Sequence, residues 1–166
     1  MQSKAKAMMT PTKRKKNNRT ALQEAVWLLA RRPLSQKELR LKLQQRLYSA
    51  SDIDETLETL THRGALDDVA LCRRLFQLYS EEGGHGLRYI LFKLKMRGLS
   101  TDCLADEIRL WQDTDEDDRQ AMLLLEKRGV HPANEAESRK MLRLLATRGF
   151  SPATLYRIAD RLGYEE

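Results

Sequence analysis

The amino-acid sequence predicts an all-α protein in which three tandem three-helix repeats form an elongated curved body. Apolar residues recur three and four positions apart from about residue 20 to residue 163, as they do on one face of an α-helix. Leu87, Ile90, Leu91 and Leu94 are one example. No convincing strand pattern of alternating apolar and polar residues appears. The apolar pattern also repeats with a period of 51 residues, which is typical of a helical repeat protein.

Identical residues mark this period at three positions of every repeat. The triples are Leu43, Leu94 and Leu145; Arg46, Arg97 and Arg148; and Ser49, Ser100 and Ser151. Apolar residues keep the same register at Leu39, Ile90 and Met141, at Ile53, Leu104 and Leu155, and at Leu60, Trp111 and Leu162. Because each unit packs only on its neighbours, such repeats stack into a curved body rather than a sphere.

Turn residues divide each repeat into three helices. In repeat one (20–66), the turn at 32–34 ends the first helix, and the other two helices are predicted at 36–46 and 51–62. Repeat two (67–114) has a first helix before the glycines of 83–86, followed by helices at 86–97 and 101–112. Repeat three (115–166) starts with a helix around 117–128, which fits the period least well, and continues with 137–148 and a last helix after Ser151. The repeated serines are good N-caps for the third helices.

The N-terminal segment 1–19 differs in charge from the rest of the chain. It holds seven basic residues and no acidic one, while the whole chain has a net charge of +6, so the remainder has a net charge of −1. A lysine-rich segment of this kind is expected to be disordered. It would add a weak, salt-sensitive attraction to nucleic acid.

Basic residues within the repeats concentrate in the second helices. The segments 36–46 and 137–148 each carry four basic residues and one acid, and 86–97 carries four basic residues and no acid, whereas the third helices lean acidic. Stacked repeats would align the second helices into a basic band that suits DNA phosphates or the acidic wall of a protein groove. The candidate partner-binding residues in this band are Lys37, Arg40, Lys42, Arg88, Lys93, Lys95, Arg139, Lys140 and Arg143.

Two sets of basic residues repeat in register, and their interpretations differ. Arg46, Arg97 and Arg148 end their helices, where the helix dipole favours a cation, so a helix-end role competes with partner binding. Lys37, Arg88 and Arg139 are expected in the first turn, where a cation opposes the dipole. Local stability does not explain this second set, which leaves either partner contact or an ordinary solvated face.

No motif indicates catalysis, a cofactor or a metal, so the protein is predicted not to be an enzyme. The glycines of 83–86 lack the Lys and Ser or Thr of a phosphate-binding loop. The acidic stretch 113–118 lacks the glycine and glutamate of a calcium loop and is interpreted as a solvated linker that leads into a helix. Cys72 and Cys103 match no zinc or redox spacing, so reduced and largely buried thiols are expected, as are core positions for both tryptophans. No apolar run approaches a membrane span, and a cytoplasmic protein is expected.

Three stretches of the sequence carry motifs of a known family. Ala25 to Leu43 contains Leu-x-x-Arg, Ser-x-x-Glu-Leu-Arg and Lys-Leu. The segment 64–68 reads Gly-Ala-Leu-Asp-Asp and is followed by Leu71, Phe76 and Tyr79. The segment 84–100 begins with Gly-His-Gly, continues with Ile90 and Leu94, and ends in Gly-Leu-Ser. Together they resemble the RecX family of bacterial recombinase regulators, over roughly residues 20 to 163. Ala65 and Cys72-Arg73 depart from the commoner family residues, which affects local packing rather than function.

The resemblance implies a tandem three-helix protein that binds along RecA nucleoprotein filaments and typically inhibits RecA ATP hydrolysis, strand exchange and coprotease activity. It places the protein in the SOS response and DNA repair, with the basic helices against acidic groove surface or DNA phosphates. A monomer is expected, with no membrane partner and no cofactor. The alternative is a helix-turn-helix-like nonspecific DNA-binding protein, because three-helix units and a basic tail also fit that class.

Overall fold

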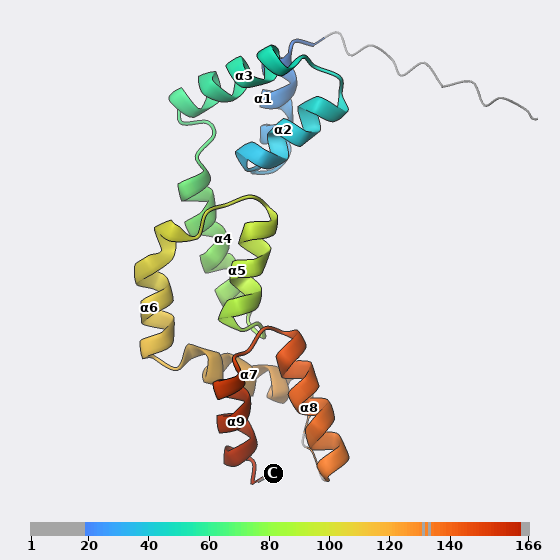
Figure 1. Cartoon of the computed structure of the whole chain (residues 1–166), viewed down its shortest axis with the longest axis vertical. Coiled ribbons are helices and arrows are strands. Elements are labelled where there is room, and N and C mark those ends of the chain that lie inside the picture. The colour runs from blue at the N-terminus through green and yellow to red at the C-terminus, as the bar shows by residue number, and fades with distance from the viewer. Residues whose placement is uncertain (1–18, 131, 133, 164–166) are drawn as a thin grey trace, which may run out of the picture.

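The structure is a computed structural model that describes residues 19–130, 132 and 134–163. Residues 1–18, on which the prediction of a disordered basic tail rests, lie outside the described residues. Within those described ranges the chain forms nine α-helices and one short 3-10 helix, and no strand. The helices gather into three groups of three that follow one another along the longest axis (Figure 1). The prediction of an elongated all-α protein with three tandem three-helix repeats is confirmed.

Repeat one consists of α1 (Ala21–Arg31), α2 (Gln36–Gln45) and α3 (Ala50–His62). Hydroxyl side chains determine where these helices begin. Thr20 and Ser35 each accept a hydrogen bond from the third backbone N–H of the following helix, and the side chain at that third position bonds back to the cap N–H. Ser49 caps α3 by accepting from the backbone N–H of Asp52. The core of the repeat contains Ala25, Leu28, Leu34, Leu39, Leu43, Ile53, Leu57, Leu60 and Leu66.

Repeat two consists of α4 (Asp68–Glu82), α5 (Leu87–Met96), the 3-10 helix η1 (Asp102–Leu104) and α6 (Ala105–Asp113). The helix predicted at 101–112 therefore opens with a 3-10 turn, where the Ser100 hydroxyl donates to the Asp102 carboxylate at 2.7 Å. Phe76 packs edge-on against Trp111, with ring centroids 5.9 Å apart. The core contains Leu71, Cys72, Phe76, Leu87, Ile90, Leu94, Leu99, Leu104 and Trp111.

Repeat three consists of α7 (Glu116–Lys127), α8 (Glu135–Thr147) and α9 (Pro152–Arg161), with a core of Ala121, Leu124, Leu125, Met141, Leu145, Phe150 and Ile158. The interpretation of 113–118 as a solvated linker that leads into a helix holds for 113–115, which are exposed and precede α7, but it was wrong for Asp117 and Asp118. Asp118 is only 4% exposed, and Arg157 of α9 donates to both of its carboxylate oxygens, at 2.6 and 2.7 Å. Asp117 accepts hydrogen bonds from the Leu87 N–H and the Trp111 indole. Asp117 and Asp118 have structural roles, because groups from distant segments of the chain form hydrogen bonds with their carboxylates.

The repeats join through their second helices, which lie end to end (Figure 1). The start of α2 meets the end of α5, where the Ser35 hydroxyl donates to the Arg97 carbonyl at 2.5 Å. The start of α5 meets the end of α8, where the Gly86 N–H donates to the Arg148 carbonyl at 2.9 Å. Both contacts satisfy carbonyls that a helix C-terminus leaves unpaired. The predicted limits between repeats, after residues 66 and 114, fall between helices.

Two sequence-based expectations for core residues need correction. Trp111 is buried, but Trp27 is 36% exposed and lies between two guanidinium groups, with Arg31 4.4 Å and Arg19 5.0 Å from its ring centroid. Contacts between cations and an aromatic ring stabilise the ring even where it is partly exposed. The position of Trp27 on the apolar stripe of α1 therefore did not mean that it was buried. Cys72 is buried, which raises the pKa of its thiol to about 12, whereas Cys103 is only half-buried.

Candidate functional site

The outward side of α2, α5 and α8 carries a basic residue at matching positions. Lys37, Arg88 and Arg139 are all exposed, one in each repeat, and helical spacing places them away from the buried positions of their helices. Lys37 and Arg88 lie in the first turn, as predicted. The prediction was wrong for Arg139, which is the fifth residue of α8, because Asn134 caps that helix early.

Several cations of this face have no ion-pair partner within the described part of the chain. This group comprises Lys37, Arg88, Lys95, Lys140 and Arg143, of which all five are exposed. Arg139 differs, since its guanidinium contacts the Glu135 carboxylate one turn earlier. An exposed pair of this kind contributes little stability, so Arg139 is also accessible to a partner. The positive charge of the face is thus not neutralised by the fold.

Other predicted site residues have structural partners. Arg40 of α2 pairs with Asp54 of α3 at 2.7 Å, and the Lys93 ammonium lies 3.8 Å from the ring centroid of Tyr79. Arg46 pairs with the buried Glu24 at 2.8 Å and donates to the Lys42 carbonyl, in agreement with a helix-end role. Lys42 itself is half-buried.

Arg97 connects repeats one and two. Its guanidinium donates to both oxygens of Glu38, at 3.2 and 2.8 Å, and to the Pro33 carbonyl at 2.9 Å. Burial would raise the pKa of Glu38, but hydrogen bonds from Arg97 and the Ser35 N–H, together with the charge of Arg32, lower it overall. The carboxylate therefore stays ionised, and the pair holds α2 against the end of α5. Among the repeated arginines, Arg97 has the most extensive set of structural contacts.

Arg148 lies at the second junction, beside His85. The imidazole stacks on Tyr89 with ring centroids 4.3 Å apart, and its Nδ1 is buried without a hydrogen-bond partner in the described residues. Burial lowers the pKa of His85, and the positive charges of Arg148 and Lys93 lower it further. Burial and the two neighbouring cations thus favour the uncharged form of the imidazole that stacks on α5.

Comparison with known proteins identifies the family. The family model described as RecX, first three-helix domain, matches residues 21–60, which is nearly all of α1 to α3. A protein named Regulatory protein RecX from Xanthomonas campestris pv. campestris (strain B100) is 31% identical over 156 residues, covering 92% of this chain and 93% of its own length. The chain belongs to the RecX family. A Regulatory protein RecX of Ralstonia pickettii (strain 12J) is 32% identical over 83% of this chain and 87% of its own.

Solved RecX structures share the fold. The crystal structure of RecX from Lactobacillus salivarius superposes with a TM-score of 0.67 at 19% identity, over 86% of this chain and 94% of that one. A second crystal structure of regulatory protein RecX gives a TM-score of 0.69 at 17% identity, over 84% and 71% of the two chains. These relatives are named as regulators rather than enzymes. Of the helices described in this RecX family member, none combines the length and apolar character that a bilayer crossing requires.

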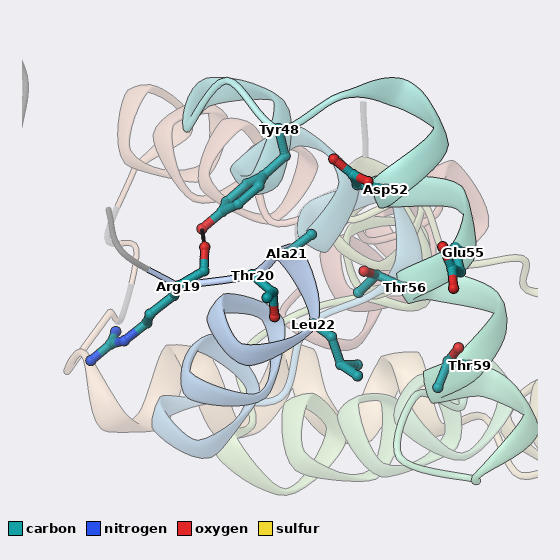
Figure 2. A pocket seen from close by; sticks show the side chains of 9 residues that line it. All are labelled: Arg19, Thr20, Ala21, Leu22, Tyr48, Asp52, Glu55, Thr56 and Thr59. Atoms are coloured by element: carbon teal, nitrogen blue, oxygen red, sulfur yellow. Dashed lines mark hydrogen bonds between the residues drawn. The ribbon is translucent and has the colours of Figure 1, made fainter. Parts of the chain in front are cut away.

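The chain also has a pocket in repeat one, between the start of α1 and α3 (Figure 2). The Tyr48 hydroxyl donates to the Arg19 carbonyl at 2.9 Å and closes one side of it. Its lining residues are Arg19, Thr20, Ala21, Leu22, Tyr48, Asp52, Glu55, Thr56 and Thr59. Asp52 lies in the first turn of α3, where the helix dipole stabilises a carboxylate, so a structural role accounts for it.

Sequence reasoning missed three exposed apolar residues on the same face of this RecX protein. Leu41, Phe92 and Met96 follow Lys37 and Arg88 at intervals of one helical turn. The 51-residue period already places Leu41 and Phe92 at the same position of successive repeats. The spacing of apolar residues along a helix is the same whether they face the core or the solvent. Only the exposed fractions of the side chains, which the structure provides, distinguish the two cases.

Proposed function

We propose that this RecX family member binds RecA nucleoprotein filaments and inhibits RecA ATP hydrolysis, strand exchange and coprotease activity. The observation that supports this proposal is that an exposed cation recurs in every repeat, at Lys37, Arg88 and Arg139. These residues lie on second helices whose ends meet (Figure 1). A partner that repeats along its own axis, as a filament does, can engage successive repeats of the chain at once.

Regulation by binding requires no catalytic group. A body that contacts neighbouring filament subunits favours whichever filament state offers more contacts, and thereby shifts the equilibrium between states. Occupation of the groove would also exclude substrates sterically. We propose that the protein acts as a cytoplasmic monomer, and that contacts of its basic helices with DNA phosphates are secondary to the contacts with RecA.

The first test adds purified protein, at amounts well below one molecule per RecA subunit, to RecA filaments on single-stranded DNA. We expect ATP hydrolysis to fall at ratios too low to coat the DNA. Binding to free DNA is measured in parallel at the same salt concentration. Inhibition that appears only when the DNA itself is saturated would contradict the proposal and favour the nonspecific DNA-binding alternative.

Charge reversal tests whether the exposed side of α2, α5 and α8 contacts the filament. The triple variant Lys37→Glu, Arg88→Glu and Arg139→Glu is expected to weaken filament binding roughly tenfold or more, since each change replaces attraction with repulsion. A control with the same net charge reverses Arg63, Arg74 and Arg128, which are exposed on other elements. Circular dichroism checks that both variants keep their helicity. If the two variants bound the filament with equal affinity, α2, α5 and α8 would not be the helices that contact it.

A further inference from the structure

Leu41, Phe92 and Met96 form an exposed apolar stripe on the outward side of α2 and α5. Their exposed fractions are 48%, 57% and 64%. Single exposed apolar residues are common and need no explanation. These three are not scattered, because Phe92 and Met96 are one turn apart on α5 and Leu41 occupies the position of Phe92 in the preceding repeat.

The junction between the repeats brings the two helices of this stripe together. The end of α5 abuts the start of α2, and the aliphatic part of the Lys37 side chain lies directly on Gly98, two residues after Met96. The order is Arg88, Phe92 and Met96 along α5 and then, past the junction, Lys37 and Leu41 along α2. Two helices that are far apart in sequence thus contribute to one surface.

Cations without carboxylates border the stripe. Lys37, Arg88 and Lys95 are exposed beside it and have no ion pair in the part of the chain that the structure describes. The sequence of α5 contains no acidic residue, and the one acid of α2, Glu38, is bonded to Arg97. Charge complementarity therefore calls for a partner surface in which carboxylates surround apolar side chains.

We infer that Leu41, Phe92 and Met96 are the apolar anchors with which the chain contacts a protein surface ringed by acidic residues. This inference rests on the proposed function, in which that surface belongs to the RecA filament. Phenylalanine, methionine and arginine are enriched in protein interfaces, and anchors one helical turn apart fit a groove. Single-stranded nucleic acid is a poorer fit, because Leu41 and Met96 have no ring on which a base stacks.

The stripe ends at repeat three. The positions that correspond to Phe92 and Met96 are Arg143 and Thr147, so the face of α8 is basic and polar. Repeats one and two therefore provide the apolar contact and repeat three only a charged one. Salt should weaken the contact of repeat three more than that of the other two, because ions screen charges but not apolar burial.

The test measures the affinity of N-terminally labelled full-length protein for RecA filaments and, separately, for free single-stranded DNA, at low and high salt. The variants are Met96→Ser and the double change Phe92→Ser and Met96→Ser. Leu110→Ser is the matched control, because Leu110 is also 64% exposed but lies on α6, away from the stripe. Thermal denaturation establishes that all variants fold.

We expect the double variant to bind filaments roughly tenfold more weakly at both salt concentrations, Met96→Ser to be intermediate, and Leu110→Ser to match the wild type. Affinity for free DNA should not change. Filament binding that survives the double change would overturn the inference while leaving the proposed function intact. An equal loss of DNA affinity, or a wild-type dimer that the double variant disrupts, would overturn it as well. If the wild-type protein did not bind RecA filaments, both the proposed function and this inference would be refuted.

Discussion

Leu47 occupies a position where the other two repeats have glycine. The backbone there is left-handed in all three, with φ values of 65° at Leu47, 81° at Gly98 and 78° at Gly149. A Cβ at Gly98 would overlap the Lys37 side chain, and one at Gly149 would lie 2.5 Å from the Tyr89 backbone nitrogen. Leu47, by contrast, is 84% exposed. The side chain is tolerated because, among the residues that the structure describes, no neighbouring repeat packs on this turn.

Replacing Leu47 with glycine should stabilise the protein. A non-glycine residue in this conformation is strained, and we expect Leu47→Gly to raise the free energy of unfolding by about 0.5 to 1 kcal/mol, measured by urea denaturation. Gln44→Gly is the control, because Gln44 lies within α2, where glycine costs about 1 kcal/mol. A loss of stability in both variants would show that Leu47 is not strained.

His85 should make stability depend on pH. Burial, followed by Arg148 and Lys93, lowers its pKa below the usual 6.5, so the unfolded chain takes up a proton more readily than the folded one. The contribution of the neutral histidine is present above about pH 6.5 and is lost as the pH falls through the lowered value. We expect the free energy of unfolding to fall between about pH 7 and pH 5, and to fall less in His85→Phe, which keeps the ring stack on Tyr89. Identical pH profiles would exclude a role for His85.

At the scale of helices, the start of α7 depends on partners from other elements. No side chain caps this helix, and Asp115, its N-cap residue, is left-handed. Asp117 instead receives hydrogen bonds from Leu87 and Trp111, and Asp118 is held by Arg157. These contacts join α7 to α5, α6 and α9, which explains why this helix fitted the period least well.

Asp118→Asn should loosen repeat three. We expect the free energy of unfolding to fall by about 2 kcal/mol, the usual effect of removing hydrogen bonds to a buried charged group. Asp113→Asn is the control, since Asp113 forms only an exposed pair with Arg109 and should have almost no effect. The hydrogen bond from Arg157 lowers the pKa of Asp118, so the pair stabilises above about pH 3.8 and is lost below it. Asp118→Asn should therefore be less sensitive to acid than the wild type.

At the scale of the whole molecule, the described residues form three separate cores, which are connected at the junctions by side-chain hydrogen bonds, an ion pair and close backbone contacts. The second junction is the clearest case. Gly86 has an ordinary φ of −77°, yet a Cβ there would overlap the Gly149 carbonyl. The glycine is required by the approach of two backbones and not by its own conformation. The angle between neighbouring repeats therefore depends on a few close contacts at each junction.

Gly86→Ala should separate repeats two and three. The added methyl group would overlap the Gly149 carbonyl. We therefore expect loss of the hydrogen bond from Gly86 to Arg148 and a change in the radius of gyration, measured by small-angle X-ray scattering. Gly129→Ala is the control, because Gly129 has a positive φ but open space around it. That control should lose about 1 kcal/mol of stability without a change in shape. An unaltered scattering profile for Gly86→Ala would show that the junction tolerates the methyl group.

The sequence by itself determined the helices, their number and their repetition. Leu39, Ile90 and Met141 are predicted in one register and are all buried, as are Leu43, Leu94 and Leu145. Ser49 and Ser151 cap the third helices of their repeats, as expected, but the prediction was wrong for Ser100, because η1 lies between Ser100 and α6. These features follow from sequence because helical spacing and capping act over three or four residues.

Only the tertiary structure decided which polar groups became structural and which stayed exposed. Glu38 and Arg97 are 59 residues apart, and Asp118 and Arg157 are 39 apart, so no local pattern pairs them. The same holds for Phe92 and Met96, which periodicity cannot distinguish from core residues. A residue's position on a helix is a local property, whereas the surface that covers it depends on how three repeats pack end to end.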